Sequence, residues 1–367
     1  MNDRLGALSD AGISIWLDDM SRDRLASGNL VELINDFHVS GATSNPSIFA
    51  AALSGSELYD DQLRELKAAG ADVDKILTTV TTDDIRDACD VFADLYKETN
   101  GVDGRVSIEV DPRHAHELEE TIAQAHELHK IVGRDNAYIK IPATKVGLAA
   151  IESCTAAGID INVTLIFSVD RYREVLEAYL SGLEQAHENG VDISKVHSVA
   201  SVFVSRNDVE VDKRLEAIGT DEALALRGKA ALAVCRLCHE VFKEVEASDR
   251  WAKLAKEGGN LQRPLWASTG TKNPEYSDVL YVEDLVTAGC VNTMPEATLK
   301  AFADHGEVKG DMVSGTYDAS REVVSAVEKA GVDMADVFQV LEDEAVEKFI
   351  APWEGLIETL TKKLETL

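Results

Sequence analysis

The sequence predicts an α/β fold, a (β/α)8 TIM barrel, from the order of its segments. Short β-branched runs alternate with longer amphipathic segments, which is typical of βα units around a parallel sheet. Eight such runs are present, and nearly every one contains or is followed by a polar side chain. Eight strands, each followed by helix, favour a closed barrel over an open doubly wound sheet. Because no linker, low-complexity segment or fixed-period repeat interrupts the pattern, we expect a single domain, residues 1–367, with extra helices.

The predicted strands are short and lie along the whole chain. They are residues 13–18 (ISIWLD), 40–44 (SGATS), 105–110 (RVSIEV), 137–142 (AYIKIP), 160–167 (DINVTLIF), 197–204 (HSVASVFV), 263–268 (RPLWAS) and 289–294 (GCVNTM). Apolar side chains at helical spacing predict the helices between them. We expect helices over 115–132, 169–186 and 222–247, two more over 57–69 and 82–98, and a last one over 349–366.

Polar residues at the strand ends predict where a site lies. In a TIM barrel the carboxyl ends of the strands meet at one face, so side chains there converge. The residues at or just beyond these ends are Asp18, Asp19, Asn45, Glu109, Asp111, Lys140, Asn162, Thr164, Ser201, Arg206, Ser268, Thr269 and Lys272.

Lys140, inside the run YIKIP, is the most informative single residue. A lysine within a β-branched strand is unusual because burying an unpaired ammonium costs much free energy. One interpretation is an edge strand whose lysine points to solvent. The other is a desolvated amine that attacks a ketone carbonyl, because the resulting iminium accepts the electron pair of a breaking carbon–carbon bond.

Two carboxylates are candidates for the accompanying proton transfers. Strand alternation places Ser107, Glu109 and Asp111 on one side of the third strand. Glu109 could protonate the carbinolamine, directly or through a water molecule. Asp18 could take the proton of the sugar hydroxyl during retro-aldol cleavage of the carbon–carbon bond.

Helix capping is the alternative role for Asp18 and its neighbour Asp19. Both precede a helix predicted near residues 21–35, where an aspartate commonly caps the first turn. The residues alone do not decide between capping and catalysis for either carboxylate.

Three polar side chains are candidates for holding a phosphate: Arg206, Ser201 and Lys272. Lys272 belongs to STGTKN, residues 268–273, whose glycine and hydroxyls could form an anion-binding turn after a strand. TIM barrels frequently bind phosphate in loops after their last two strands.

Charge and cysteine content narrow the partners and the compartment. Acidic residues number 66 against 36 basic ones, and the net charge of −30 repels nucleic acid and anionic membranes. A phosphorylated substrate would therefore need a local group of cations. The five cysteines, an odd number, indicate free thiols, and no secretory or membrane-spanning signal is present. We expect a cytoplasmic protein.

Several motifs taken together resemble one enzyme family. GATSNPSIF, VSIEVD, YIKIPAT, INVTLIFS, SVASVFVSR and WASTGTKNP, in this order, are similar to transaldolase. The likeness extends from Trp16 to the segment near 291–302. It implies a (β/α)8 barrel of the non-oxidative pentose phosphate pathway. It also implies transfer of a dihydroxyacetone unit from a ketose phosphate to an aldose phosphate, without a cofactor or metal.

The resemblance also implies residue roles. Lys140 would form the Schiff base, Glu109 and Thr164 would hold a catalytic water, and Asp18 would be the general acid/base, with Asp19 as the alternative. The residues that would bind the ketol hydroxyls are Thr43, Asn45, Asn162 and Ser201. Arg206 would bind phosphate with Lys272 beside it, where many relatives have arginine.

Other signals are better explained by structure. The histidines of HAHELEETIAQAHELH, residues 114–129, include a pair three apart that could bind zinc, but a solvated helix face is the better interpretation. Cys235 and Cys238 have CxxC spacing inside an apolar stripe, which favours core packing. No dinucleotide or P-loop motif is present.

Two rival functions remain open from the sequence. One is a class I aldolase that releases free dihydroxyacetone, and the other is a catalytically silent barrel that binds a sugar phosphate. The helix over 349–366 either docks on its own chain, caps the barrel or contacts a second subunit. A homodimer is therefore left open as well.

Overall fold

The computed structural model describes residues 3–367, and its centre is a closed barrel of eight parallel strands in the order of the sequence. The strands are β1 (Ser14–Leu17), β2 (Val39–Thr43), β3 (Arg105–Glu109), β4 (Ala137–Pro142), β5 (Ile161–Ile166), β6 (Ser198–Phe203), β7 (Arg263–Ala267) and β8 (Val291–Met294). β1 pairs with β8, which closes the barrel. The predicted fold class and all eight predicted strands are therefore confirmed.

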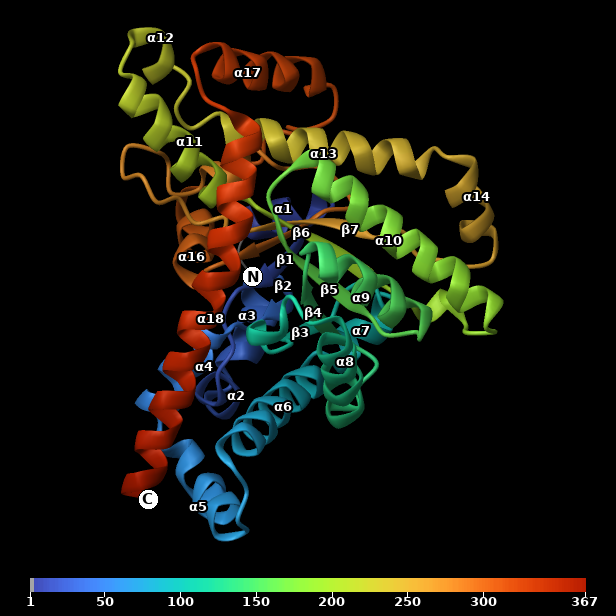
Figure 1. Ribbon diagram of the computed structural model, residues 1–367, viewed down its shortest axis with the longest axis vertical. Helices are drawn as coiled ribbons and strands as arrows, with labels where there is room; N and C mark the ends of the chain where they lie inside the picture. The colour runs from blue at the N-terminus through green and yellow to red at the C-terminus, as the bar shows by residue number, and fades with distance from the viewer. Residues whose placement is uncertain (1–2) are drawn as a thin grey trace.

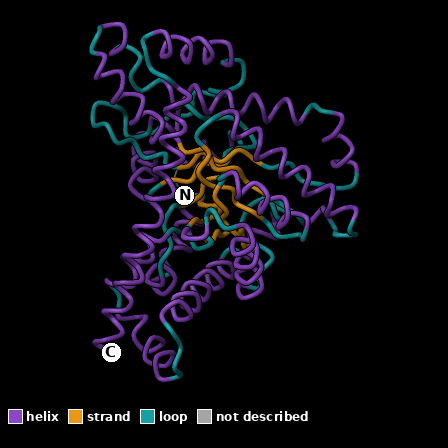
Figure 2. Tube along the Cα trace, in the orientation of Figure 1, coloured by secondary structure: helices purple, strands orange, loops and turns teal. Residues whose placement is uncertain are grey.

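Helices surround the strands on all sides, as Figure 2 shows. They are α1 (Asp3–Asp10), α2 (Arg22–Ser27), α3 (Asn29–Phe37), α4 (Pro46–Gly55), α5 (Asp60–Ala68), α6 (Val73–Val91), α7 (Ala93–Glu98), α8 (Leu118–Val132), α9 (Lys145–Ala156), α10 (Val169–Glu188), α11 (Val204–Ile218), α12 (Asp221–Leu224), α13 (Ala230–Glu246), α14 (Asp249–Lys256), α15 (Leu280–Glu283), α16 (Glu296–His305), α17 (Tyr317–Lys329) and α18 (Met334–Thr366). Three 3-10 helices, η1 (Glu57–Tyr59), η2 (Pro112–His114) and η3 (Ile193–Lys195), lie between them.

Large side chains fill part of the barrel interior. Trp16 of β1 and Tyr138 of β4 are buried with ring centroids 6.0 Å apart. Gly41 of β2 makes this possible, because a Cβ atom there would lie 2.6 Å from Nε1 of Trp16. The absence of a side chain at Gly41 therefore leaves room for the indole inside the barrel.

Two predicted helices are interrupted by residues in left-handed backbone. The helix expected near 21–35 divides into α2 and α3 at Gly28, which has φ 77°. The helix expected over 222–247 divides into α12 and α13, and Gly228 between them has φ 71°. Because the Gly228 amide donates to Asp212 at 2.9 Å, it is satisfied outside a helix. The prediction of one continuous helix in each of these two segments was therefore wrong.

The C-terminal helix is longer than predicted and lies across the barrel. α18 starts at Met334, fifteen residues before the expected 349. It contacts α4, α6, α11 and β5 of its own chain. Figure 1 shows it running along one side of the molecule from α17 toward α5. α18 therefore docks on its own barrel.

No helix within residues 3–367 combines the length and the apolar run needed to cross a membrane. The five cysteines are buried and free, and Cys235 and Cys238 of α13 belong to the main hydrophobic core. The prediction that this CxxC pair packs in the core is confirmed.

Candidate active site

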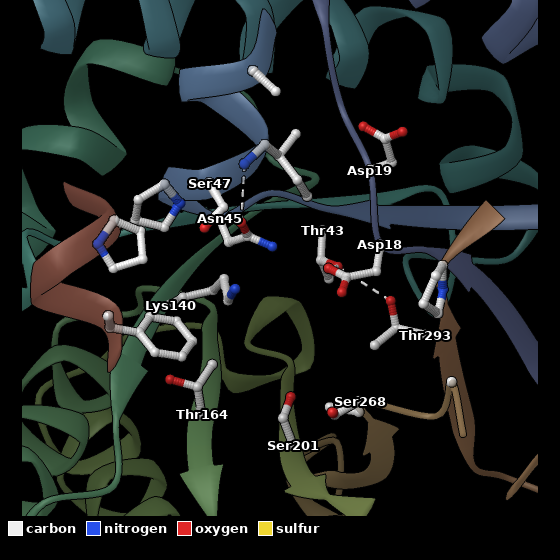
Figure 3. Close-up of a pocket in the computed structure, with 18 of the residues that line it drawn as sticks. Asp18, Asp19, Thr43, Asn45, Ser47, Lys140, Thr164, Ser201, Ser268 and Thr293 are labelled. Atoms are coloured by element: carbon white, nitrogen blue, oxygen red, sulfur yellow. Dashed lines mark hydrogen bonds between the residues drawn. The ribbon is translucent and has the colours of Figure 1, made fainter. Parts of the chain in front are cut away.

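A pocket of about 750 Å³ opens at the carboxyl ends of the strands, where the sequence predicted a site. Figure 3 shows polar side chains from several strands pointing into it. Nine of the ten predicted site residues line it: Asp18, Thr43, Asn45, Lys140, Asn162, Thr164, Ser201, Arg206 and Lys272. The tenth, Glu109, borders a smaller cavity of about 20 Å³ and touches the pocket through its contact with Lys140.

Lys140 lies in the middle of a buried strand and is 6% exposed. Its neighbours across the sheet are Glu109 of β3 and Asn162 of β5, which are its register partners. The Nζ atom donates a hydrogen bond to the Ser44 carbonyl at 2.9 Å and lies 3.7 Å from Oε2 of Glu109. Because β4 pairs on both sides, the interpretation of β4 as an edge strand was wrong.

The Glu109 carboxyl is buried between the barrel interior and α6 and α8. Burial raises its pKa, the cations Lys140 and Arg206 oppose that shift, and the nearby Asp18 adds to it, so that the pKa lies at about 7. Oε2 accepts no hydrogen bond from residues 3–367, since Lys140 is too distant for one. Near neutral pH this side chain can therefore both donate and accept a proton.

The two neighbouring aspartates have different surroundings. Oδ1 of Asp18 accepts a hydrogen bond from Thr43 at 2.7 Å, and Thr43 is 3.1 Å from the Thr293 hydroxyl of β8. Asp19 instead forms an ion pair with Arg24 of α2. Figure 3 shows Asp18 beside Thr43 and Thr293, with Asp19 farther toward the rim.

Neither aspartate caps the helix that follows. Ser21 is the N-cap of α2 and accepts a hydrogen bond from the Arg24 amide. The capping alternative for Asp18 and Asp19 was therefore wrong. Asp18 is left as a carboxylate held at the pocket by a hydroxyl.

The hydroxyl and amide side chains of β5 and β6 form a chain along the pocket wall. Ser201 donates to Oδ1 of Asn162 at 2.7 Å, and the Asn162 amide donates to Ser107 at 3.1 Å. The Asn45 side chain caps α4 by accepting from the Ile48 amide at 3.1 Å. These bonds fix the directions in which the remaining lone pairs and protons face the pocket.

Thr164 has no such partner. Its hydroxyl is buried and makes no hydrogen bond with residues 3–367. The next residue, Leu165, has φ 61°, and the register between β5 and β6 shifts over Val163–Ile166. A bulge of this kind changes the direction of a side chain, and left-handed backbone at a leucine costs about 1 kcal/mol or more. The backbone is thus distorted beside a hydroxyl that faces the pocket unpaired.

Arg206 lies in the first turn of α11 and contacts two aromatic rings. Its guanidinium carbon is 5.2 Å from the ring centroid of Phe203 and 5.6 Å from that of Phe349. Burial lowers its pKa, and the carboxylates of Glu109 and Glu344 oppose this shift. Its Nη1 atom has no hydrogen-bond partner within residues 3–367. The guanidinium therefore has a donor left for an anion.

The loop after β7 brings further polar groups to the same pocket. Ser268 has φ 56°, and its hydroxyl lies 2.8 Å from that of Ser205. Lys272 lines the pocket from the exposed part of this loop. The carboxylates that line the pocket are Asp18, Asp19, Asp23 and Glu296, whereas the cations are Lys140, Arg206, Lys272 and Lys348.

Among the pocket residues that the sequence reasoning missed are Thr293, Phe203, Lys348 and Phe349. Thr293 ends the eighth predicted strand, so the argument used for the other strand ends would have found it. Lys348 and Phe349 belong to α18, and no local signal in the sequence indicates that this helix reaches the barrel mouth.

Within residues 3–367, histidine, cysteine and carboxylate side chains form no group of three or more arranged to hold a metal ion. His126 and His129 lie on α8, where burial and His126 lower the pKa of His129. Neither histidine lines the pocket of about 750 Å³.

A barrel with a buried amine beside a carboxylic acid, and with cations at one side of its mouth, defines an enzyme for carbonyl chemistry on small anions. Comparison with known proteins agrees with this class. Residues 15–360 match the family model of transaldolase/fructose-6-phosphate aldolase. The chain belongs to this family.

Relatives align with the protein over nearly its full length. A transaldolase of Mycolicibacterium smegmatis is 60% identical over 364 residues, which are 99% of this chain and 98% of the relative. One of Mycobacterium tuberculosis is 57% identical over 366 residues, covering 100% and 98%. Transaldolase 2 of Streptomyces coelicolor is 53% identical over 367 residues, covering 100% and 99%. At this identity and coverage, the chain has the function of a transaldolase, an enzyme of the transferase class.

Proposed function

We propose that Lys140 carries the reaction as a Schiff base and transfers a dihydroxyacetone unit between sugar phosphates. In one direction sedoheptulose 7-phosphate and glyceraldehyde 3-phosphate give erythrose 4-phosphate and fructose 6-phosphate. The pair formed by Lys140 and Glu109 at 3.7 Å inside the barrel is the observation that carries this proposal. An amine in this environment is a nucleophile for a ketone, and a carboxyl with a pKa near 7 suits the proton transfers that follow.

The first half-reaction breaks one carbon–carbon bond. The Lys140 amine adds to the ketose carbonyl, and the carbinolamine loses water to give an iminium. Asp18 removes the proton of the hydroxyl on the fourth carbon, the bond between carbons three and four breaks, and its electron pair forms an enamine on Lys140. The aldose phosphate leaves, and the second half-reaction repeats these steps in reverse with a new aldose.

Glu109 supplies the proton for loss of water from the carbinolamine, directly or through a water held jointly with Thr164. Its raised pKa and the unpaired Thr164 hydroxyl support this assignment. For Asp18 the support is its contact with Thr43 at the pocket, while the ion pair of Asp19 with Arg24 argues against Asp19 as the acid/base.

The substrate lies with its hydroxyls on Thr43, Asn45, Asn162 and Ser201 and its phosphate on Arg206, with Lys272 beside it. The unpaired Nη1 donor of Arg206 supports this direction, because a planar guanidinium binds phosphate well. The pocket carboxylates Asp23 and Glu296 lie on α2 and α16, whereas Arg206 lies on α11, so a phosphate is favoured near α11.

Borohydride trapping tests the covalent step. The enzyme is incubated with fructose 6-phosphate, reduced and digested, and the peptides are analysed by mass spectrometry. We expect a reduced dihydroxyacetone adduct on Lys140 and none in Lys140→Ala. No adduct, or an adduct on another lysine, would contradict the proposal and favour a barrel that only binds its ligand.

A second measurement separates transfer from lysis. Free dihydroxyacetone is assayed with fructose 6-phosphate alone and then with added erythrose 4-phosphate. We expect little release without the acceptor and sedoheptulose 7-phosphate formation with it. Rapid release without an acceptor would instead identify an aldolase.

We further propose that the enzyme works in the cytoplasm. The five free, buried cysteines support a reducing compartment. The substrates named above are the only partners the proposal needs.

A further inference from the structure

One turn of the C-terminal helix forms part of the pocket wall. Lys348, Phe349 and Pro352 of α18 line the pocket that contains Lys140. The ring centroids of Phe349 and Phe203 lie 5.6 Å and 5.2 Å from the guanidinium carbon of Arg206. The two ring centroids are 6.4 Å apart. α18 therefore contacts the pocket at the proposed phosphate end, and Lys348 precedes the aromatic residue that makes this contact.

The charge of Lys348 is directed to a carboxylate on its own helix. Its ammonium forms an ion pair with Glu344, one turn earlier. Lys348 holds the pKa of Glu344 below its ordinary value, and Lys213 and Arg206 act in the same direction. Three cations, two of which (Lys348 and Arg206) line the pocket, thus act on one carboxylate. The point at which their attraction overlaps is where another anion would also be stabilised.

The ion pair between Lys348 and Glu344 is weak enough for Lys348 to exchange Glu344 for another anion. The Lys348 and Glu344 side chains are 57% and 44% exposed. Exposed pairs of this kind contribute about 0 to 1 kcal/mol. A doubly charged phosphate at the pocket would therefore compete well with a single carboxylate for the lysine.

We propose that Lys348 is a third cation of the phosphate site, and that Glu344 holds it until the substrate binds. On binding, the Lys348 ammonium leaves Glu344 and pairs with the sugar phosphate, while Arg206 keeps its position against the two rings. This makes α18 a determinant of specificity for phosphorylated over unphosphorylated sugars. The inference rests on the proposed function, in which Arg206 binds the phosphate.

Lys348→Gln tests the inference, and Lys362→Gln is its matched control. Lys362 lies on the same helix and forms the same kind of pair, with Glu358 at 2.5 Å, but does not line the pocket. We expect Lys348→Gln to raise KM for fructose 6-phosphate about 5- to 20-fold with kcat nearly unchanged. Its effect with unphosphorylated fructose should be less than about twofold, and Lys348→Arg should restore KM. Lys362→Gln should change neither constant.

Glu344→Gln distinguishes the proposed role of Lys348 in phosphate binding from a purely structural role of the ion pair. Loss of a competing carboxylate should lower KM for fructose 6-phosphate about two- to threefold. It should also lower the inhibition constant of inorganic phosphate by a similar factor. If Lys348 served only the helix, the same change would leave both values unchanged or raise them, and that outcome would overturn the inference.

Arg206→Ala separates the two levels of the argument. If Arg206→Ala raises KM and Lys348→Gln does not, the role of Lys348 is rejected and the phosphate site stands. If neither variant changes KM or phosphate inhibition, the phosphate end has been assigned to the wrong side of the pocket, and both proposals fail.

Discussion

The Nζ atom of Lys140 and the Oε2 atom of Glu109 lie 3.7 Å apart on neighbouring strands, at the same level of the barrel interior. Each side chain is less than one-tenth exposed. Burial raises the pKa of the Glu109 carboxyl and the Lys140 cation lowers it, which leaves that pKa at about 7. Near neutral pH Glu109 is therefore present in both its acid and its carboxylate form.

The pH dependence of Glu109→Gln follows from this. Since the pKa of Glu109 is raised to about 7, the proton it donates is present below pH 7 and lost above it. In the native enzyme, kcat for fructose 6-phosphate should therefore decline as the pH rises, with an inflection near pH 7. Glu109→Gln should lower kcat about 10²- to 10³-fold and remove that inflection, because its amide does not titrate.

The control is a pH profile measured at saturating substrate with Lys362→Gln, which alters only a surface ion pair. An inflection that persists unchanged in Glu109→Gln would assign it to another group. The role of Glu109 as a proton donor would then be wrong.

Asp18→Asn and Asp19→Asn should have unequal effects. Asp18 contacts Thr43 at the pocket, so replacing it should lower kcat about 10²-fold or more with little effect on stability. Asp19→Asn removes an ion pair with Arg24, which still contacts Glu296 at 2.5 Å, and should leave kcat within about threefold. Steady-state kinetics of both variants decide the matter, and a larger loss in Asp19→Asn would reverse the assignment.

Arg206→Ala should mainly weaken substrate binding. The guanidinium lies against the rings of Phe203 and Phe349, so its loss removes a charge for phosphate and a packing partner for both rings. We expect KM for fructose 6-phosphate to rise at least 10-fold, equivalent to about 1.4 kcal/mol. Arg206→Lys should recover only part of this, because an ammonium lacks the planar fork of donors with which a guanidinium binds phosphate. An unchanged KM would reject Arg206 as a phosphate ligand.

Gly41→Ala tests the packing of the barrel interior. The added Cβ would lie 2.6 Å from Nε1 of Trp16, and the fully buried indole has no space into which it could move. We expect the free energy of unfolding to fall by about 2 to 3 kcal/mol, measured by denaturant titration. Gly55→Ala is the control, because no atom lies within 4 Å of its added Cβ, and it should be neutral or slightly stabilising. Equal stability of the two variants would contradict this account.

The strands and the strand-end residues were predictable because both depend on local sequence. Period-two alternation placed Glu109 on one side of β3, and parallel strands carry residues such as Lys140 and Asn162 to the same face. The position of α18 was not predictable in this way. Helical periodicity shows which face of a segment is apolar, but it does not show which other helices cover that face. The contact between Phe349 and Arg206 joins residues on α18 and α11, which are far apart in the chain, and it becomes visible only once the chain is folded.

The helix breaks were missed for a related reason. Gly28 and Gly228 were visible in the sequence, but a glycine within a helical pattern is often tolerated. α12 ends at Leu224, and the amide of Gly228 in the break before α13 donates its hydrogen bond to the Asp212 carboxylate of α11 instead of to a helical carbonyl. The energetic choice between continuing and ending the helix therefore depends on a residue sixteen positions away.

Thr164→Val should make the protein more stable and less active. The Thr164 hydroxyl is buried without a hydrogen-bond partner in residues 3–367, and a buried unpaired hydroxyl costs about 1 to 3 kcal/mol. Valine keeps the branched shape without that polar atom, so the free energy of unfolding should increase by about 1 kcal/mol. In the proposed reaction the same hydroxyl positions the water beside Glu109, so kcat should fall about 10-fold or more while KM changes little. Thr164→Ser retains the hydroxyl and is the control, with most of kcat expected to remain. A Thr164→Val enzyme with lower stability and native kcat would mean that the hydroxyl serves the fold, because a structural group lowers stability when it is removed and leaves the chemistry intact.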